Sequence, residues 1–116
     1  MLFLHISHVF EEIWGEFTAI DVMDSLGLFL TVNLVIFALV LILLYTLIVG
    51  KRWAFIAAQV YAVAMIVNGI GHNAMVLITG RYFGGFAGSI SGVGLAIAGV
   101  LLFIFARAEM PGKHLG

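Results

Sequence analysis

A histidine and two glutamates lie close together within an apolar stretch at the start of the chain. His8 precedes Glu11 and Glu12 in the segment Leu2-Phe-Leu-His-Ile-Ser-His-Val-Phe-Glu-Glu-Ile-Trp14. Residues three and four apart share one face of a helix, so His8 lies beside both carboxylates if this stretch is helical. Ionisable side chains are costly inside a membrane, and there they mark a functional site by default.

Histidine and carboxylate on one helical face can present two metal ligands together. A later apolar segment carries His72, which would add a ligand from a facing helix. We therefore predict a metal site formed by His8, Glu11, Glu12 and His72. Nitrogen and oxygen ligands suit zinc, iron or manganese, and the chain has no cysteine to supply a thiolate.

The two adjacent glutamates also suit proton chemistry. Two neighbouring carboxylates are mutually unfavourable in a low dielectric when both are charged, so one of them would hold a proton. Such a group suits acid–base catalysis on a lipid-like substrate or a proton relay through the bilayer. We predict Glu11 as the catalytic group, acting either as a general base or as a metal ligand.

Further polar residues are expected at the depth of the glutamates. Counted at about 1.5 Å per residue along the expected helices, polar side chains of four segments lie roughly 10 Å below one membrane face. Three of these polar residues are predicted to contact the metal-ligating side chains and so to hold their orientation: Asn68, Asn33 and Ser89.

The composition indicates a membrane protein of a single domain. Of 116 residues, 64% are hydrophobic and 9% are charged, whereas a soluble domain is about one-quarter charged. Apolar segments predict helices at about 2–17, 26–49, 53–79 and 84–106, in a domain over 1–108 with a polar tail at 109–116. The last three have about the twenty residues that cross a bilayer core, and the first is short. The predicted fold is an all-α, integral membrane four-helix bundle.

The few basic residues predict an orientation in the membrane. Lys51 and Arg52 follow the second segment, and Arg107 and Lys113 follow the fourth. Four crossings place both groups on one side, which is the cytoplasm by the positive-inside rule. Both termini would then be cytoplasmic, with Arg81 as the exception on the opposite side. The net charge is −1 and the basic residues form no cluster, so the sequence predicts no basic surface for binding nucleic acid.

Small residues recur at every fourth position of the last segment, in the row Gly84, Gly88, Gly92 and Ala96. Such rows let helix backbones approach closely in lipid. The close packing is expected either inside the bundle or between copies, so the row could support a homo-oligomer or a larger membrane complex.

The chain resembles the HXXEE-domain family of small bacterial membrane proteins. The family signature His-x-x-Glu-Glu is present as His8-Val-Phe-Glu11-Glu12, and the family's Asn-x-x-x-His element matches Asn68-Gly-Ile-Gly-His72. An aromatic–glycine turn follows at Arg81-Tyr-Phe-Gly-Gly85, where Gly84 stands at a position that is often proline in the family. The resemblance covers about residues 5 to 105 and implies no established activity. It implies a bacterial cytoplasmic membrane, and that the matched His, Glu and Asn residues belong together.

Three functions remain open from the sequence. The leading hypothesis is a metal-binding integral membrane protein, which includes a metal-dependent enzyme acting on a lipid-soluble substrate. A proton-relay or transport protein would use the paired glutamates instead, although the apolar stretches Val35–Leu44 and Leu95–Phe105 offer no wet path. A small accessory subunit would pack its apolar surface into a larger membrane complex, but that role does not explain two adjacent glutamates.

Overall fold

The computed structural model describes residues 1–17, 20 and 25–111, and these residues form helices without any strand. In chain order the elements are α1 (Leu2–Trp14), α3 (Leu26–Ile48), α4 (Arg52–Thr79), the short irregular segment η1 (Tyr82–Phe86) and α5 (Ser89–Ala108). The all-α prediction is therefore confirmed for this part of the chain. The four-helix transmembrane bundle stays a prediction, because the long helices number three among the described residues.

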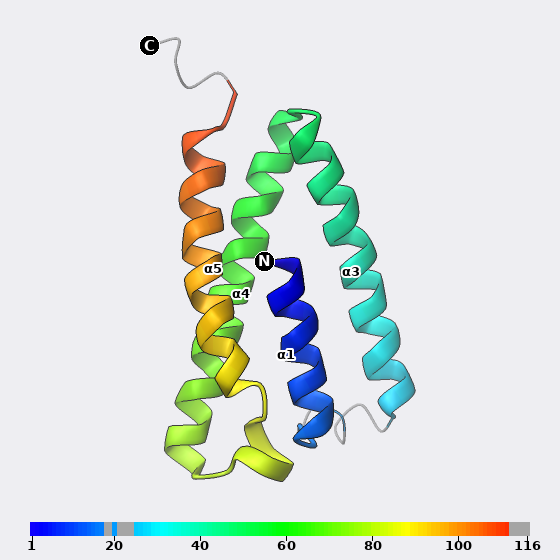
Figure 1. Ribbon diagram of the computed structural model, residues 1–116, viewed down its shortest axis with the longest axis vertical. Coiled ribbons are helices and arrows are strands. Elements are labelled where there is room, and N and C mark those ends of the chain that lie inside the picture. The colour runs from blue at the N-terminus through cyan, green and yellow to red at the C-terminus, as the bar shows by residue number, and fades with distance from the viewer. Residues whose placement is uncertain (18–19, 21–24, 112–116) are drawn as a thin grey trace.

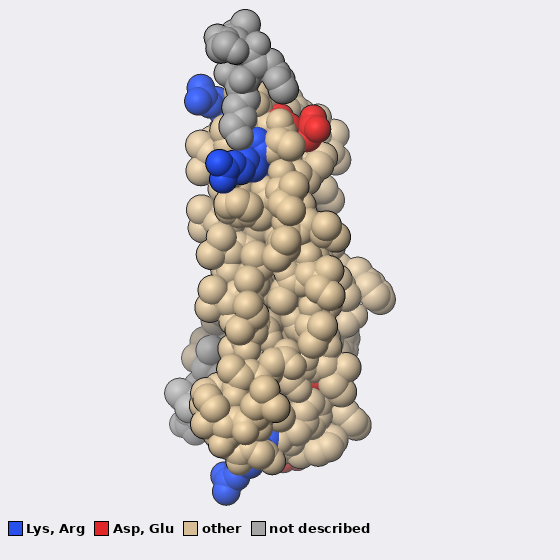
Figure 2. Space-filling view, turned by 90° about the vertical axis from the view of Figure 1, so that its left-hand side faces the viewer, with Lys and Arg blue, Asp and Glu red and all other residues tan. Residues whose placement is uncertain are grey.

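Helices α3, α4 and α5 are long and apolar enough to cross a membrane. They have 23, 28 and 20 residues, and a rise of about 1.5 Å per residue makes each at least about 30 Å long. On the face drawn in Figure 2, the Lys and Arg side chains lie at the two ends of the molecule, with a long stretch lacking them between. These features are compatible with an integral membrane protein.

Helix α1 lies beside only part of the length of the long helices. Its 13 residues extend over about 20 Å, which is too short to cross a bilayer core. Figure 1 shows α1 between α3 and α4, with its first residue about midway along their length. The helix ends at Trp14 rather than near residue 17, because the chain turns at Gly15 and at Glu16, which has a φ of 55°.

Helices α4 and α5 pack closely because small residues face one another. A Cβ atom on Gly69 of α4 would collide with the carbonyl of Gly92 on α5, and a Cβ atom on Gly99 would lie 2.9 Å from the carbonyl oxygen of Ala62. The predicted small-residue row thus serves, at Gly92, the packing within this chain. A role of the row in an oligomer stays a prediction.

Helix α5 begins at Ser89 rather than near residue 84. Two glycines bend the preceding chain through left-handed conformations, Gly84 with a φ of 61° and Gly88 with a φ of 107°. Residues with a side chain rarely adopt such φ angles, so glycine at these two positions lets the backbone change direction before α5 begins. The turn carries η1 and the start of α5 over the end of α1, where Gly84 donates its N–H to the carbonyl of Gly15 at 2.9 Å. The predicted tail from residue 112 onward lies outside the described residues.

Candidate metal centre

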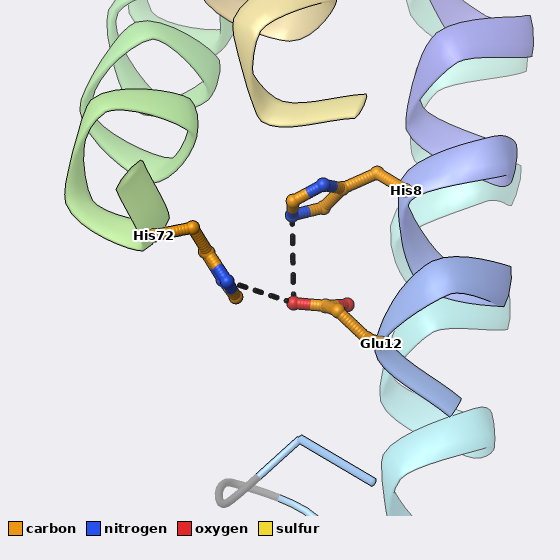
Figure 3. Close-up of side chains that lie close together, drawn as sticks. All are labelled: His8, Glu12 and His72. Atoms are coloured by element: carbon orange, nitrogen blue, oxygen red, sulfur yellow. Dashed lines mark ion pairs between the residues drawn. The ribbon is translucent and has the colours of Figure 1, made fainter. Parts of the chain in front are cut away.

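Helices α1 and α4 bring two imidazoles and a carboxylate together in a buried position (Figure 3). His8 and Glu12 lie one turn apart on α1, and His72 reaches them from α4. The Nε2 atoms of His8 and His72 lie 3.5 and 3.2 Å from the same oxygen, Oε1 of Glu12. The exposed fractions are 1% for His8, 6% for Glu12 and 5% for His72. The structure therefore gathers three of the four residues predicted as metal ligands.

Hydrogen bonds of His8 determine which ring nitrogen carries its proton. The Nδ1 atom lies 2.9 Å from Oγ of Ser91, whose own hydroxyl proton is directed at the carbonyl of Gly88. Because that hydroxyl has only one proton to give, Nδ1–H of His8 is the donor and Ser91 accepts. The amide of Asn68 donates to Nε2 at 3.0 Å. The lone pair of His8 Nε2 thus accepts this hydrogen bond, which a metal ion bound at Nε2 would replace.

The second imidazole is held in the same tautomer. The Nδ1 atom of His72 lies 3.4 Å from the carbonyl oxygen of Phe86. A carbonyl can only accept, so Nδ1–H of His72 donates and its Nε2 atom carries the lone pair when the ring is neutral. This Nε2 atom faces Oε1 of Glu12, as the dashed line in Figure 3 marks.

This donor set fits a divalent transition metal. The lone pair of His72 Nε2 and the carboxylate oxygen of Glu12 face one another, which is repulsive unless positive charge lies between them. Within the described part of the chain, the ion pairs of Glu12 join it to His8 and His72, which carry positive charge only when protonated. Tetrahedral coordination at about 2.0–2.1 Å would place ligand atoms about 3.3 Å apart. The measured separations are 3.5 and 3.2 Å, and candidate ligand atoms of all three residues lie within 4.8 Å of one another.

Gly88 allows the two imidazoles to approach each other. A Cβ atom at this position would lie 2.7 Å from Cε1 of His8 and 3.0 Å from Nδ1 of His72. The aromatic ring of Phe17 covers His72 on another side, with ring centroids 4.5 Å apart. The site is therefore shaped by a missing side chain at the start of α5 and by a ring just beyond the end of α1.

The carboxylate of Glu11 points to a different neighbour from that of Glu12. Its Oε1 atom accepts hydrogen bonds from the hydroxyl of Tyr82 at 2.5 Å and the N–H of Ile90 at 3.0 Å, and its Oε2 atom accepts from the N–H of Ser91 at 2.7 Å. Ile90 and Ser91 belong to the first turn of α5, whose N-cap residue Gly88 has no side chain to satisfy these N–H groups. Glu11 thus caps α5 from another helix, and its negative charge is favourable beside the helix N-terminus.

The hydroxyl of Tyr82 keeps its proton for this contact. Burial and the neighbouring Glu11 carboxylate raise the pKa of Tyr82 to about 12. Tyr82 therefore remains a donor to Glu11 at any physiological pH. The catalytic and metal-binding roles of Glu11 stay predictions, and its contacts in the structure are those of a helix cap.

The three residues predicted to orient the metal ligands differ in the hydrogen bonds that they make. Asn68 contacts His8 directly. Asn33 donates to the carbonyl of Phe29 in its own helix at 2.9 Å, and Ser89 accepts at its backbone carbonyl from the amide of Asn73 at 2.9 Å. Of the three, Asn68 is thus the one that hydrogen-bonds to an imidazole in the described contacts.

Sequence reasoning missed three partners of the histidines. Ser91 lies two residues after Ser89 and was not among the predicted site residues, and the carbonyl of Phe86 is a backbone group without any sequence signal. The third is Tyr61, whose hydroxyl lies 2.9 Å from Nδ1 of His5, a residue with an exposed fraction of 4%. Tyr61 shares a helical face with Asn68 and His72, so its position in the sequence was an available signal.

Comparison of the chain with family models, curated proteins and solved structures finds no match. The function must therefore be argued from the site itself.

Proposed function

We propose that this chain is an integral membrane protein that binds a divalent transition metal through His8, Glu12 and His72. The observation that carries the proposal is that both imidazole Nε2 atoms lie within 3.5 Å of one buried oxygen of Glu12. A metal ion bound there would compensate the carboxylate and both lone pairs at once. Zinc, iron and manganese are the candidates that accept two imidazoles and one carboxylate.

A set of three protein ligands suits catalysis better than a purely structural role. Structural zinc sites usually have four protein ligands, whereas catalytic sites have three and leave a position for water or substrate. A metal in such a site supplies a water of lowered pKa or polarises a carbonyl or phosphoryl oxygen. We therefore propose a metal-dependent enzyme acting on a lipid-soluble substrate, with hydrolysis as the reaction class that this donor set favours.

Neighbouring residues would keep the ligands in position for this chemistry. Ser91 and the carbonyl of Phe86 each accept the Nδ1–H of one histidine, which directs the Nε2 atoms inward. Such outer contacts orient metal-ligating imidazoles and raise their basicity. Glu11 would act one step further away, by fixing the start of α5 and with it Ser91.

The same residues support the proposed membership in the HXXEE-domain family. The first and last residues of its signature, His8 and Glu12, and both residues of its second element, Asn68 and His72, lie in one contact group. We also propose a bacterial cytoplasmic membrane with the α3–α4 turn on the cytoplasmic side, because Lys51 and Arg52 lie at that turn.

Elemental analysis of the detergent-purified protein tests the metal proposal. We expect near-stoichiometric zinc, iron or manganese in the wild type, and its loss in Glu12→Gln and His72→Ala. Glu16→Gln is the matched control, because this exposed carboxylate lies just beyond the same helix. Metal retained by Glu12→Gln, or no metal in the wild type after reconstitution with each ion, would overturn the proposal. The second result would leave protons as the positive charge in the site.

A further inference from the structure

A fourth polar side chain contacts the three candidate metal ligands. Asn68 donates its amide N–H to Nε2 of His8 at 3.0 Å, and this Nε2 atom is the one assigned above to the metal. Asn68 lies one turn before His72 on α4, just as His8 lies one turn before Glu12 on α1. Residues four apart share a helical face. Each of the two helices therefore directs a pair of side chains to the same place.

Metal binding and the hydrogen bond of Asn68 exclude each other. The Nε2 atom of a neutral imidazole has one lone pair, which can accept a hydrogen bond or bind a metal ion. An ion bound to Nε2 of His8 would leave the Asn68 N–H without its acceptor. It would also face the positive ends of the N–H bonds, which is unfavourable. The amide of Asn68 must therefore change its orientation when the metal binds.

A turned amide would offer its oxygen to the metal in place of its nitrogen. The carboxamide carries a carbonyl oxygen with two lone pairs beside its NH₂ group. Its terminal torsion is soft and roughly two-fold, so a half-turn exchanges the two atoms. In the described part of the chain, the side-chain hydrogen bond of Asn68 is the one to His8. The turn therefore breaks only the contact that the metal replaces.

The position of the Asn68 side chain fits a fourth ligand. Neighbouring ligand atoms of a tetrahedral site lie about 3.3 Å apart. The side-chain nitrogen of Asn68 lies 3.0 Å from Nε2 of His8, and the two Nε2 atoms lie 3.5 and 3.2 Å from Oε1 of Glu12. An amide oxygen in place of this nitrogen would complete a set of two nitrogen and two oxygen ligands. Carbonyl oxygens are established ligands of divalent ions such as manganese.

We propose that Asn68 is the fourth ligand of the metal centre, bound through Oδ1, and that an incoming oxygen ligand displaces it. The assignment rests on the proposed function, because it needs a metal ion at Nε2 of His8. A neutral amide oxygen holds a cation less strongly than the charged carboxylate of Glu12. Asn68 would therefore fill the fourth position at rest and give it up to water or to a carbonyl or phosphoryl oxygen. In this exchange one metal–oxygen bond breaks and another forms, without transfer of a proton or an electron.

Two substitutions of Asn68 test whether its oxygen binds the metal. Asn68→Asp keeps the shape and an oxygen but has no N–H to donate, whereas Asn68→Ala has neither. Zn²⁺ affinity is measured by competition with a coloured chelator. We expect Asn68→Asp to bind at least as tightly as the wild type, and Asn68→Ala to bind at least about tenfold more weakly. Gln59→Ala should change nothing, because this side-chain amide of α4 donates to the carbonyl of Phe55 in its own helix.

The other roles of Asn68 give different patterns of affinity. If its N–H only orients His8, both variants should bind Zn²⁺ more weakly than the wild type. If its N–H only competes with the metal for Nε2, both should bind more tightly. Either pattern, or unchanged affinity in Asn68→Ala, would overturn the fourth ligand. The metal proposal would still stand if the wild type binds Zn²⁺ and His72→Ala does not. A wild type that binds no ion would refute both proposals.

A spectroscopic titration tests the displacement of Asn68. The protein is saturated with Co²⁺, whose visible spectrum reports its ligands, and is titrated with azide. Azide has to displace the amide oxygen in the wild type but only water in Asn68→Ala. The variant should therefore respond at azide concentrations at least about tenfold lower, and Gln59→Ala should respond like the wild type. Equal concentrations for the wild type and Asn68→Ala would show that Asn68 does not occupy the position that azide takes.

Discussion

Adjacent residues in α1 have separate tasks because of helical geometry. Successive positions in a helix are turned by about 100°, so the neighbours Glu11 and Glu12 face different helices. Glu12 meets His72 of α4, whereas Glu11 meets the first turn of α5. The paired glutamates of the sequence are thus a ligand candidate and a helix cap, and single substitutions can tell these roles apart.

Removal of the Ser91 hydroxyl should weaken metal binding without removing any ligand. In Ser91→Ala the Nδ1–H of His8 loses its acceptor, and loss of such an outer contact typically lowers metal affinity about 10–100-fold. Competition with a coloured chelator measures the change in Kd. Thr46→Ala is the control, since its hydroxyl bonds only to carbonyls of its own helix in the described contacts. An unchanged Kd for Ser91→Ala would contradict the orienting role.

A methyl group at residue 88 should push the imidazoles apart. The added Cβ atom of Gly88→Ala would lie 2.7 Å from His8 and 3.0 Å from His72, and the φ of 107° adds backbone strain of about 1 kcal/mol or more. We expect loss of bound metal together with a lower Tm. Gly71→Ala, where a Cβ atom meets nothing within 4 Å, should keep both. Full metal content in Gly88→Ala would show that the imidazoles need no glycine beside them.

At the scale of elements, the start of α5 depends on a carboxylate from α1. Glu11→Ala would leave the N–H groups of Ile90 and Ser91 without this acceptor, and the loss of a helix cap costs about 0.5–2 kcal/mol. We expect faster amide hydrogen exchange at these two positions and a lower Tm, while saturating metal still binds. Glu16→Ala should change neither. Complete loss of metal from a folded Glu11→Ala protein would instead favour Glu11 as a ligand.

The pairing of α4 with α5 depends on the absence of a side chain on one face of α4. Gly69→Val would drive its side chain into the backbone of Gly92, whereas Gly71→Val, two positions away on the same helix, enters open space. The first variant should lose several kcal/mol of stability, as overpacking at a close contact does, and the second should change only by the helix-propensity difference, which favours Val over Gly by about 0.5 kcal/mol or less. Unfolding in detergent measures both. Equal stability of the two variants would contradict this helix contact.

For the whole molecule, the positive-inside rule predicts that Lys51 faces the cytoplasm and that Arg81 lies on the opposite side of the membrane. The chain has no cysteine, so single cysteines can be introduced at exposed Lys51 and Arg81, which lie at opposite ends of α4. In intact bacterial spheroplasts a membrane-impermeant maleimide should label Arg81→Cys and not Lys51→Cys. Inverted vesicles should give the opposite pattern. Labelling of both variants from one side would contradict the crossing of the membrane by α4.

The apolar runs of the sequence are enough to predict the three long helices, and helical spacing is enough to group part of the candidate metal centre. Backbone groups in lipid must be satisfied within their own segment, so long apolar runs become helices whatever surrounds them. Helical spacing likewise placed His8 beside Glu12, and the polar positions of α4 placed Asn68 one turn from His72.

The tertiary structure alone decided how these parts meet. Helix α1 lies beside only part of the length of the long helices because its 13 residues are too few to match theirs, and this position brings Glu12 level with His72. The separation of Glu11 from Glu12 depends on where α5 begins, and left-handed Gly88 determines that start. Such contacts join residues about sixty to eighty positions apart, and no local spacing encodes them, because they result from how whole helices pack.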